Sequence, residues 1–176
     1  EDHRRRDLPK RDAMTLFCPP TLKKNLHNQA LAAALIQRES GLALHTNVPF
    51  GSDLIEMLQL RVVRYSWLPR EPYHEVLQAA KLNFAVSFAE TLNYQCAESV
   101  MLGTPSVVSP TIPFLATQGI SKVTNPNDPT EIARVALGLV SNLTEAVELQ
   151  LDCLQDYARA ANAWLRDELT KRHITA

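Results

Sequence analysis

The chain has 176 residues, a size that fits one domain. Its formal net charge is -1, from 18 Lys and Arg against 19 Asp and Glu, so no overall field is present to hold a nucleic acid or an anionic membrane through phosphate contacts. The longest apolar run, Ala30 to Ile36, is far shorter than the roughly 20 residues that span a bilayer. We therefore expect no transmembrane segment and no nucleic-acid partner.

The cysteines and histidines give no pattern of a metal site or a disulfide framework. Cys18, Cys96 and Cys153 are far apart and odd in number, and the five histidines share no ligand spacing such as HExxH. We expect no metal, no bound cofactor and a cytoplasmic location.

From residue 13 onward, short apolar runs alternate with helical patterns, whereas residues 1–12 are mostly charged and read as a solvated lead or linker. The alternation is typical of βαβ units. It predicts strands at 14–18, 42–48, 61–67, 82–88, 106–109 and 120–124, with helices at 23–37, 52–60, 71–80, 93–102 and 128–140. The expected fold class is α/β: residues 13–176 form one Rossmann-like domain, a doubly wound parallel sheet of about six strands with helices on both faces.

The last part of the chain predicts a long helix over residues 143–172. Its apolar residues recur at spacings of three and four and form one stripe: Val147, Leu151, Leu154, Ala158, Ala161 and Leu165. A terminal helix packed on the sheet is the preferred interpretation. A helix that binds a partner or a second copy is the alternative.

Two carboxylates flank the start of one predicted helix. Glu90 lies just before the helix of residues 93–102, and Glu98 lies about one and a half turns inside it. The free backbone amides near Asn93 and Tyr94 and the helix dipole favour a phosphate there. Because ligands of open α/β sheets bind beyond the carboxyl ends of the strands, this arrangement suits an elongated ligand with phosphates in the middle and hydroxyls at both ends. A nucleoside diphosphate sugar has that form.

Other common nucleotide and hydrolase motifs are absent. The five glycines form neither GxGxxG nor GxxxxGK[ST], and no GxSxG occurs. These absences disfavour a dinucleotide oxidoreductase, a P-loop enzyme and the usual α/β-hydrolase.

At residues 87–109 the sequence resembles the carboxyl-terminal, donor-binding domain of GT-B glycosyltransferases, particularly the retaining family 4 group with its E-x7-E motif. Glu90 and Glu98 match the two motif glutamates, and the turn Gly103-Thr104-Pro105 followed by an apolar strand matches the rest of the run. The resemblance implies the strand order 3-2-1-4-5-6 and transfer of a hexosyl group from a nucleoside diphosphate sugar, with retention.

The same resemblance assigns the site. It places Glu90, as the catalytic-site glutamate, on the donor-sugar hydroxyls and Glu98 on the ribose hydroxyls. It assigns backbone contacts with the diphosphate or sugar to Leu92, Asn93 and Tyr94.

The chain also departs from the family pattern. Lys24 matches the family's diphosphate-binding Lys, but Cys18 or Pro19 stands where the family usually has an Arg, and Lys23 is a partial substitute for it. The amino-terminal domain that holds the acceptor has no counterpart in this sequence. We therefore expect an amino-terminal GT-B domain or a partner chain to complete the enzyme, with the acceptor unidentified, and the isolated chain to be weakly active or inactive.

Two other functions fit parts of the pattern. Glu90 and Glu98 could be the acid and base of a glycoside hydrolase, which needs carboxyls roughly 5 to 9.5 Å apart, but the helix-start anion site would then have no use. The second alternative is a non-catalytic domain that binds a nucleotide sugar or another protein.

Overall fold

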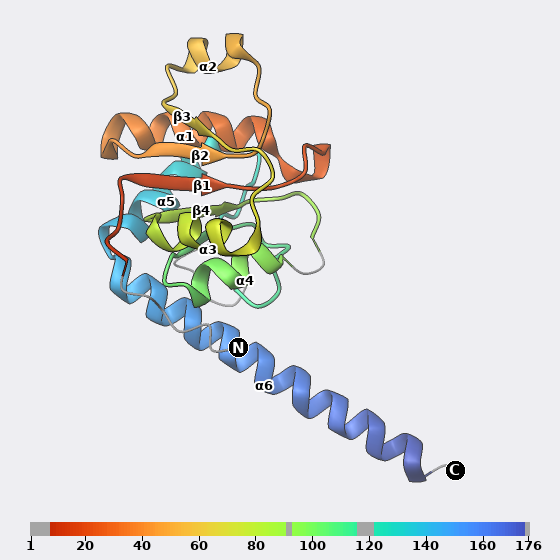
Figure 1. Cartoon of the computed structure of the whole chain (residues 1–176). Coiled ribbons are helices and arrows are strands. Elements are labelled where there is room, and N and C mark those ends of the chain that lie inside the picture. The colour runs from red at the N-terminus through yellow and green to blue at the C-terminus, as the bar shows by residue number, and fades with distance from the viewer. Residues whose placement is uncertain (1–7, 91–92, 116–121, 175–176) are drawn as a thin grey trace.

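The computed structural model describes residues 8–90, 93–115 and 122–174, and these form a parallel sheet covered by helices (Figure 1). The strands are β1 (Ala13–Leu16), β2 (Ala43–Thr46), β3 (Val62–Arg64), β4 (Leu82–Ala85) and β5 (Ser106–Val108). All are parallel, in the order β3-β2-β1-β4-β5. The α/β fold class and the first five positions of the expected strand order are confirmed.

The sheet has five strands in the described part of the chain, not the expected six. Residues 116–121, which include the start of the expected strand at 120–124, lie outside the described residues. Lys122 makes one parallel bridge to Val108, and the amide of Val123 donates to the carbonyl of Val108 at 2.8 Å. The chain therefore passes β5 in the expected direction, but in the described residues it pairs at only one position.

Helices cover both faces of the sheet. They are α1 (Leu26–Ser40), α2 (Ser52–Leu58), α3 (Arg70–Ala79), α4 (Tyr94–Met101), α5 (Pro129–Ser141) and α6 (Leu143–Ile174), with a 3-10 turn η1 (Leu22–Lys24) before α1. α1 and α5 pack together on one face, and α3 and α4 lie on the other (Figure 1). α2 lies beyond the β3 edge.

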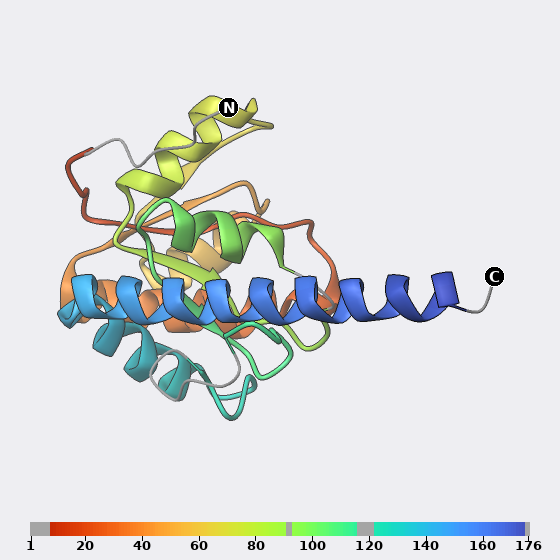
Figure 2. The same ribbon diagram turned by 90° about the horizontal axis from the view of Figure 1, so that it is seen from below.

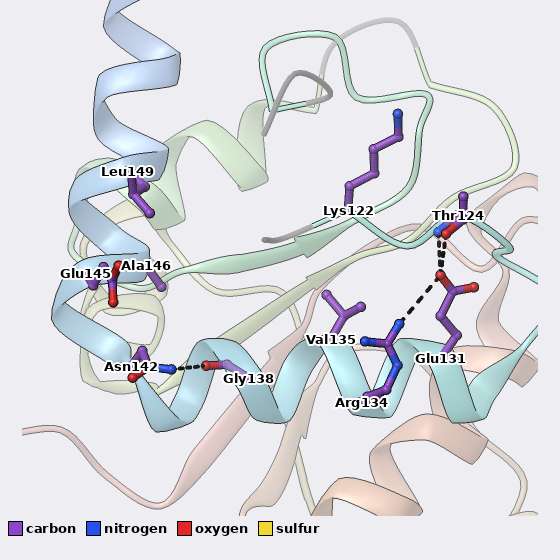
Figure 3. Close-up of a pocket in the computed structure, with 10 residues that line it drawn as sticks. All are labelled: Lys122, Thr124, Glu131, Arg134, Val135, Gly138, Asn142, Glu145, Ala146 and Leu149. Carbon is purple, nitrogen blue, oxygen red and sulfur yellow. Dashed lines mark hydrogen bonds and ion pairs between the residues drawn. The ribbon is translucent and has the colours of Figure 1, made fainter. Parts of the chain in front are cut away.

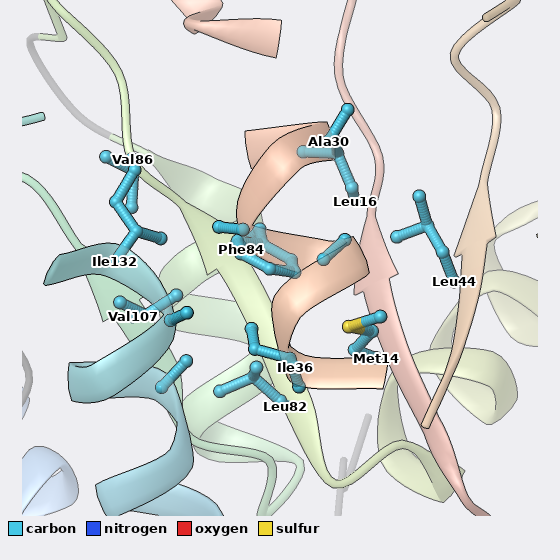
Figure 4. Close-up of a cluster of buried hydrophobic side chains, with 14 of the residues drawn as sticks. Met14, Leu16, Ala30, Ile36, Leu44, Leu82, Phe84, Val86, Val107 and Ile132 are labelled. Carbon is cyan, nitrogen blue, oxygen red and sulfur yellow. The ribbon is translucent and has the colours of Figure 1, made fainter. Parts of the chain in front are cut away.

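The main core lies between the sheet and the α1–α5 layer (Figure 4). β1 and β4 are buried at every position, as expected for central parallel strands covered on both sides. Phe84 and Met14 are the largest of the fully buried side chains. Ala30, Ala32, Ala33 and Ala34 are all buried on α1, and such small side chains let a helix lie close to the sheet. A second cluster around Cys96, Val100 and Ile112 joins α4 to α6.

The end of the charged lead is attached to the domain. The Lys10 ammonium donates to the carbonyls of Gln78 and Ala80 at 2.7 and 2.8 Å and to the Thr104 hydroxyl at 2.7 Å. The Arg11 amide donates to the carbonyl of Ala79 at 2.7 Å. Residues 10 and 11 are thus hydrogen-bonded to the end of α3 and the residue after it, whereas residues 1–7 lie outside the described part.

α6 begins beside α4 and α5 and continues past the body of the domain (Figure 2). The Gln150 side chain accepts from the Ser106 amide and donates to the Ser106 carbonyl, both at 2.8 Å, so it covers the free edge of β5. Beyond Leu154, nearly every described side chain is exposed. The first half of α6 is therefore part of the core, and the second half is not.

Candidate functional site

A cavity of about 520 Å³ opens at the carboxyl edge of the sheet. Its lining comes from the segments after β1, β2 and β3 and from the helices α3 and α4. The lining residues are Phe17, Cys18, Pro19, Asn47, Ser66, Trp67, Leu68, Arg70, Tyr73 and Glu98. This is the edge at which ligands of open α/β sheets bind, and we call it the carboxyl-edge pocket.

Glu98 enters this pocket from α4 and is oriented by α3. Its carboxylate lies 3.6 Å from His74 Nε2 and accepts a hydrogen bond from the Tyr73 hydroxyl. Burial raises the pKa of Tyr73 well above its usual value, and the negative charge of Glu98 raises it further. Tyr73 therefore stays a hydrogen-bond donor over the whole physiological range, and it directs one carboxylate while leaving the group one-third exposed to the pocket.

Glu90 and Lys24 form an ion pair beside the pocket. The Lys24 ammonium contacts Glu90 Oε2, and the two side chains are only 15% and 10% exposed. The approach is fixed by the backbone, because the Phe88 amide donates to the Lys23 carbonyl at 2.8 Å and so ties the loop after β4 to η1. Glu90 lies after the carboxyl end of β4, as predicted.

Cys18 connects the ion pair to the pocket. It lines the pocket, and burial raises the pKa of its thiol to about 11, with Lys24 lowering and Glu90 raising that pKa. Cys18 is therefore an uncharged thiol at one of the two positions, Cys18 and Pro19, where the resemblance led us to expect an arginine. Lys23, the suggested substitute, is exposed.

The start of α4 is a helix N-terminus with a side-chain cap. Asn93 is the N-cap, and its side-chain oxygen accepts from the Cys96 amide at 3.0 Å. This bond satisfies the Cys96 amide, one of the first-turn amides that have no partner within the helix. The amides of Tyr94 and Gln95 are not bonded by the cap and can donate to a ligand. The Tyr94 side chain is exposed. Leu92 lies outside the described residues.

One buried polar atom marks the same edge. The Ser87 side chain is 2% exposed, and its hydroxyl has no hydrogen-bond partner among the described residues. The Ser87 amide and carbonyl are paired with the hydroxyls of Ser109 and Thr111. A buried hydroxyl without a partner is uncommon in folded proteins, and it lies three residues before Glu90.

Several pocket residues were not predicted from the sequence. Arg70 is the first residue of α3 and brings a guanidinium to the lining, and Trp67 is 89% exposed at the pocket. Both follow β3, so their position after a strand at the carboxyl edge is a signal that could have found them. Tyr73 gives no such signal, because its contact with Glu98 depends on how α3 packs against α4.

A second cavity, of about 490 Å³, lies along α5 and the start of α6 (Figure 3). In it, the Glu131 carboxylate accepts from the amides of Thr124 and Asn125, both at 2.8 Å. Arg134 lies 4.0 Å from the same carboxylate. None of the predicted site residues lines this cavity.

The described residues hold neither a metal-binding cluster nor a membrane-spanning helix. They contain no group of three or more His, Cys, Asp or Glu side chains placed to hold a metal ion. No helix in the described ranges is long and apolar enough to cross a bilayer.

No protein-family model and no curated protein sequence matches the chain significantly. Solved structures do match in fold. The catalytic domain of cholesterol-α-glucosyltransferase from Helicobacter pylori superposes with a TM-score of 0.65 at 15% identity, over 85% of this chain and 99% of that one. An α,α-trehalose-phosphate synthase (UDP-forming) from Burkholderia xenovorans gives a TM-score of 0.65 at 13% identity, over 90% of this chain and 43% of that one. The chain resembles GT-B glycosyltransferases.

A third match is the N-terminal domain of trehalose-6-phosphate phosphatase from Candida albicans, with a TM-score of 0.67 at 11% identity, over 84% of this chain and 38% of that one. The chain thus spans about two fifths of the Candida and Burkholderia chains. At these identities the likeness shows the fold, and it agrees with the resemblance to one domain of a GT-B enzyme.

Proposed function

We propose that this domain binds a nucleoside diphosphate sugar at the carboxyl-edge pocket and presents its hexosyl group for transfer with retention. The observation that carries the proposal is the placement of Glu98: it lies in a pocket formed by the segments after three parallel strands, with the Lys24–Glu90 pair next to it. A volume of about 520 Å³ is within the usual range for small-molecule sites.

Each group has one role in the proposal. Glu98, held by Tyr73, accepts hydrogen bonds from the ribose hydroxyls. The amides at the start of α4, capped by Asn93, meet the diphosphate together with Lys24. Glu90 accepts hydrogen bonds from the sugar hydroxyls.

Transfer requires an acceptor held at the reacting carbon. Such positioning can account for ~7 to 11 kcal/mol of a reaction barrier, and in the proposal an opposing domain or a partner chain supplies it. We expect the chain alone to bind donor and to show little or no transfer. Turnover near ~1 per second by this chain alone would contradict the proposal that another domain or chain holds the acceptor.

A non-catalytic nucleotide-sugar domain is the second candidate. The observation that favours it is the lack of a charge at either expected position of the family arginine, since the Cys18 thiol is neutral and the other position is Pro19. In that case the domain still binds the nucleotide sugar, and sugar transfer is absent even when the opposing domain is supplied.

The test is a calorimetric titration of the chain with UDP, GDP, ADP and their hexose conjugates. We expect at least one pair to bind, and Glu98→Ala to weaken that binding by roughly tenfold or more, as for loss of hydrogen bonds to a charged group. Glu39→Ala is the matched control, because Glu39 is exposed near the end of α1, at the opposite edge of the sheet. Absence of binding at millimolar ligand, or binding unchanged by Glu98→Ala, would reject the proposal.

A further inference from the structure

The Lys24–Glu90 pair places a cation and an anion at the same point of the carboxyl edge. Both side chains are largely buried, so their charges are weakly screened by solvent. Any phosphate that approaches the Lys24 ammonium also meets the Glu90 carboxylate. The pair is therefore a poor general anion site, although it contains a lysine.

The two ligands of a transfer reaction differ in what they bring to this point. A free nucleoside diphosphate carries a terminal phosphate with up to one more negative charge than the same phosphate in a sugar ester. The sugar conjugate brings hydroxyl groups instead, which can donate hydrogen bonds to a carboxylate. Glu90 repels the terminal phosphate of the free nucleotide more strongly than that of the conjugate, and it accepts hydrogen bonds from the sugar of the conjugate.

We infer that the Lys24–Glu90 pair makes the site select the sugar conjugate over the free nucleoside diphosphate. The inference rests on the proposed function and adds that Glu90 lowers the affinity for the nucleotide left after transfer. Lys24 holds the Glu90 side chain in place, and Glu90 in turn offsets part of the positive charge of Lys24. Removing the Glu90 charge should then strengthen the binding of the free nucleoside diphosphate and weaken the binding of the sugar conjugate.

A purely structural role for Glu90 has a different signature. If the pair only held the loop after β4 against η1, a substitution would weaken both ligands by a similar factor. The ratio of the two dissociation constants separates the two roles, because an effect on folding cancels in it.

The experiment compares UDP and UDP-glucose by calorimetry on the intact chain, its Glu90→Gln variant and the control Glu39→Gln. GDP with GDP-mannose and ADP with ADP-glucose are run in parallel. For Glu90→Gln we expect UDP to bind about three- to tenfold more tightly and UDP-glucose more weakly, so that the ratio of their dissociation constants changes by about tenfold or more. Glu39→Gln, which removes the same charge at the opposite edge of the sheet, should leave the ratio unchanged. Because Glu90→Gln frees the charge of Lys24, its affinity for UDP should also fall more steeply with added salt.

The variant Lys24→Met/Glu90→Gln provides a second measurement without a buried unpaired charge. It should lose both the tight UDP binding of Glu90→Gln and the selectivity of the natural chain. An unchanged ratio in Glu90→Gln, equal weakening of both ligands, or natural selectivity in the double variant would overturn the inference while leaving the proposed function standing. Failure of the natural chain to bind any of the six nucleotides would overturn both.

Discussion

Tyr73 and Glu98 come from different helices, and their contact decides how the pocket presents its carboxylate. Tyr73→Phe removes the hydroxyl that donates to Glu98 and keeps the ring that packs on Phe17 at 5.6 Å between centroids. We expect the affinity for the bound nucleotide to fall by roughly three- to tenfold and the free energy of unfolding to change by no more than about 1 kcal/mol. Calorimetry and urea unfolding measure the two quantities.

Tyr157→Phe is the matched control for that change, because Tyr157 is an exposed tyrosine on α6. Equal binding by Tyr73→Phe and the natural chain would show that the Tyr73 hydroxyl does not orient Glu98.

Cys18 gives a prediction that depends on pH. Burial raises the pKa of its thiol from 9.0 to about 11, so at pH 8 the folded chain has about a hundredfold less thiolate than the unfolded chain at this residue. We expect iodoacetamide to modify Cys18 much more slowly in the native chain than in urea, and the native rate to keep rising between pH 9 and pH 11. Mass spectrometry after timed quenching measures both rates.

The same shift fixes the sign of the effect on stability. The contribution of the protonated Cys18 thiol is fully present below pH 9 and is lost as pH rises towards 11. Cys18→Ala should therefore lose less stability than the natural chain over that interval. Equal native and unfolded modification rates at pH 8 would contradict a partly buried, protonated Cys18 thiol.

The segment that carries Lys24 was predicted as one helix over residues 23–37, but it consists of a 3-10 turn and a separate helix. The break is Asn25, which has a φ of +53° and is 3% exposed. Its side chain donates to the Pro126 carbonyl at 2.6 Å. The sequence pattern continues without a break through Asn25, so it predicts one helix. The left-handed turn could not be predicted from it, because the turn depends on a contact with a residue far along the chain.

Asn25 therefore allows a matched pair of substitutions. Asn25→Gly loses the side-chain hydrogen bonds with Pro126 and Asn28 but adopts a positive φ freely, whereas Asn25→Ala loses the same bonds and is strained. We expect a loss of about 1 kcal/mol for Asn25→Gly and about 2 to 3 kcal/mol for Asn25→Ala in urea unfolding. Equal losses would mean that the left-handed turn is not what holds η1 in place.

Among the helices and strands, the sequence predicted the features that depend on local patterns, namely the presence and order of the elements and several of their ends. The helix after Glu90 and its end at Gly103, which has a φ of +83°, follow from helical periodicity and turn preferences. Asn93, expected as the first residue of that helix, is its N-cap. The short strands were overestimated in length, because apolar residues continue beyond the paired positions into the loops of the carboxyl edge, as at Phe17 and Phe88. The short helix expected over residues 52–60 begins at Ser52, with Gly51 as its N-cap, and ends at Leu58.

The residues of the candidate site could be predicted from the sequence, but the contacts between them could not. Glu90, Glu98, Asn93 and Lys24 could be proposed from one motif and its resemblance, because they lie close to strand ends and a helix start. The ion pair between Lys24 and Glu90 could not, since it joins residues 66 positions apart through the contact of two loops. Which carboxylate faces the pocket and which faces a lysine is a property of tertiary packing.

At the scale of the whole molecule, α6 belongs to the domain in its first half only. Ala146, Val147, Gln150 and Cys153 are buried, whereas Trp164 is 65% exposed. The predicted apolar stripe is real, and its outer part faces solvent. That outer part is the surface we expect an opposing domain or partner chain to contact.

The two halves of α6 should therefore respond differently to change. Gln150→Ala leaves the buried amide and carbonyl of Ser106 without their partner, and we expect it to lower the free energy of unfolding by about 2 kcal/mol or more. Removal of residues 161–176 takes away a segment whose described side chains are nearly all exposed and keeps the Tyr157 ring on Phe114, so the free energy should change by no more than about 0.5 kcal/mol. The shortened chain should also bind less of a dye that reports exposed apolar surface, because Trp164 and Leu165 are gone. Urea unfolding followed by circular dichroism compares the three chains, and a truncation as destabilising as Gln150→Ala would mean that the outer half of α6 packs against the domain in solution.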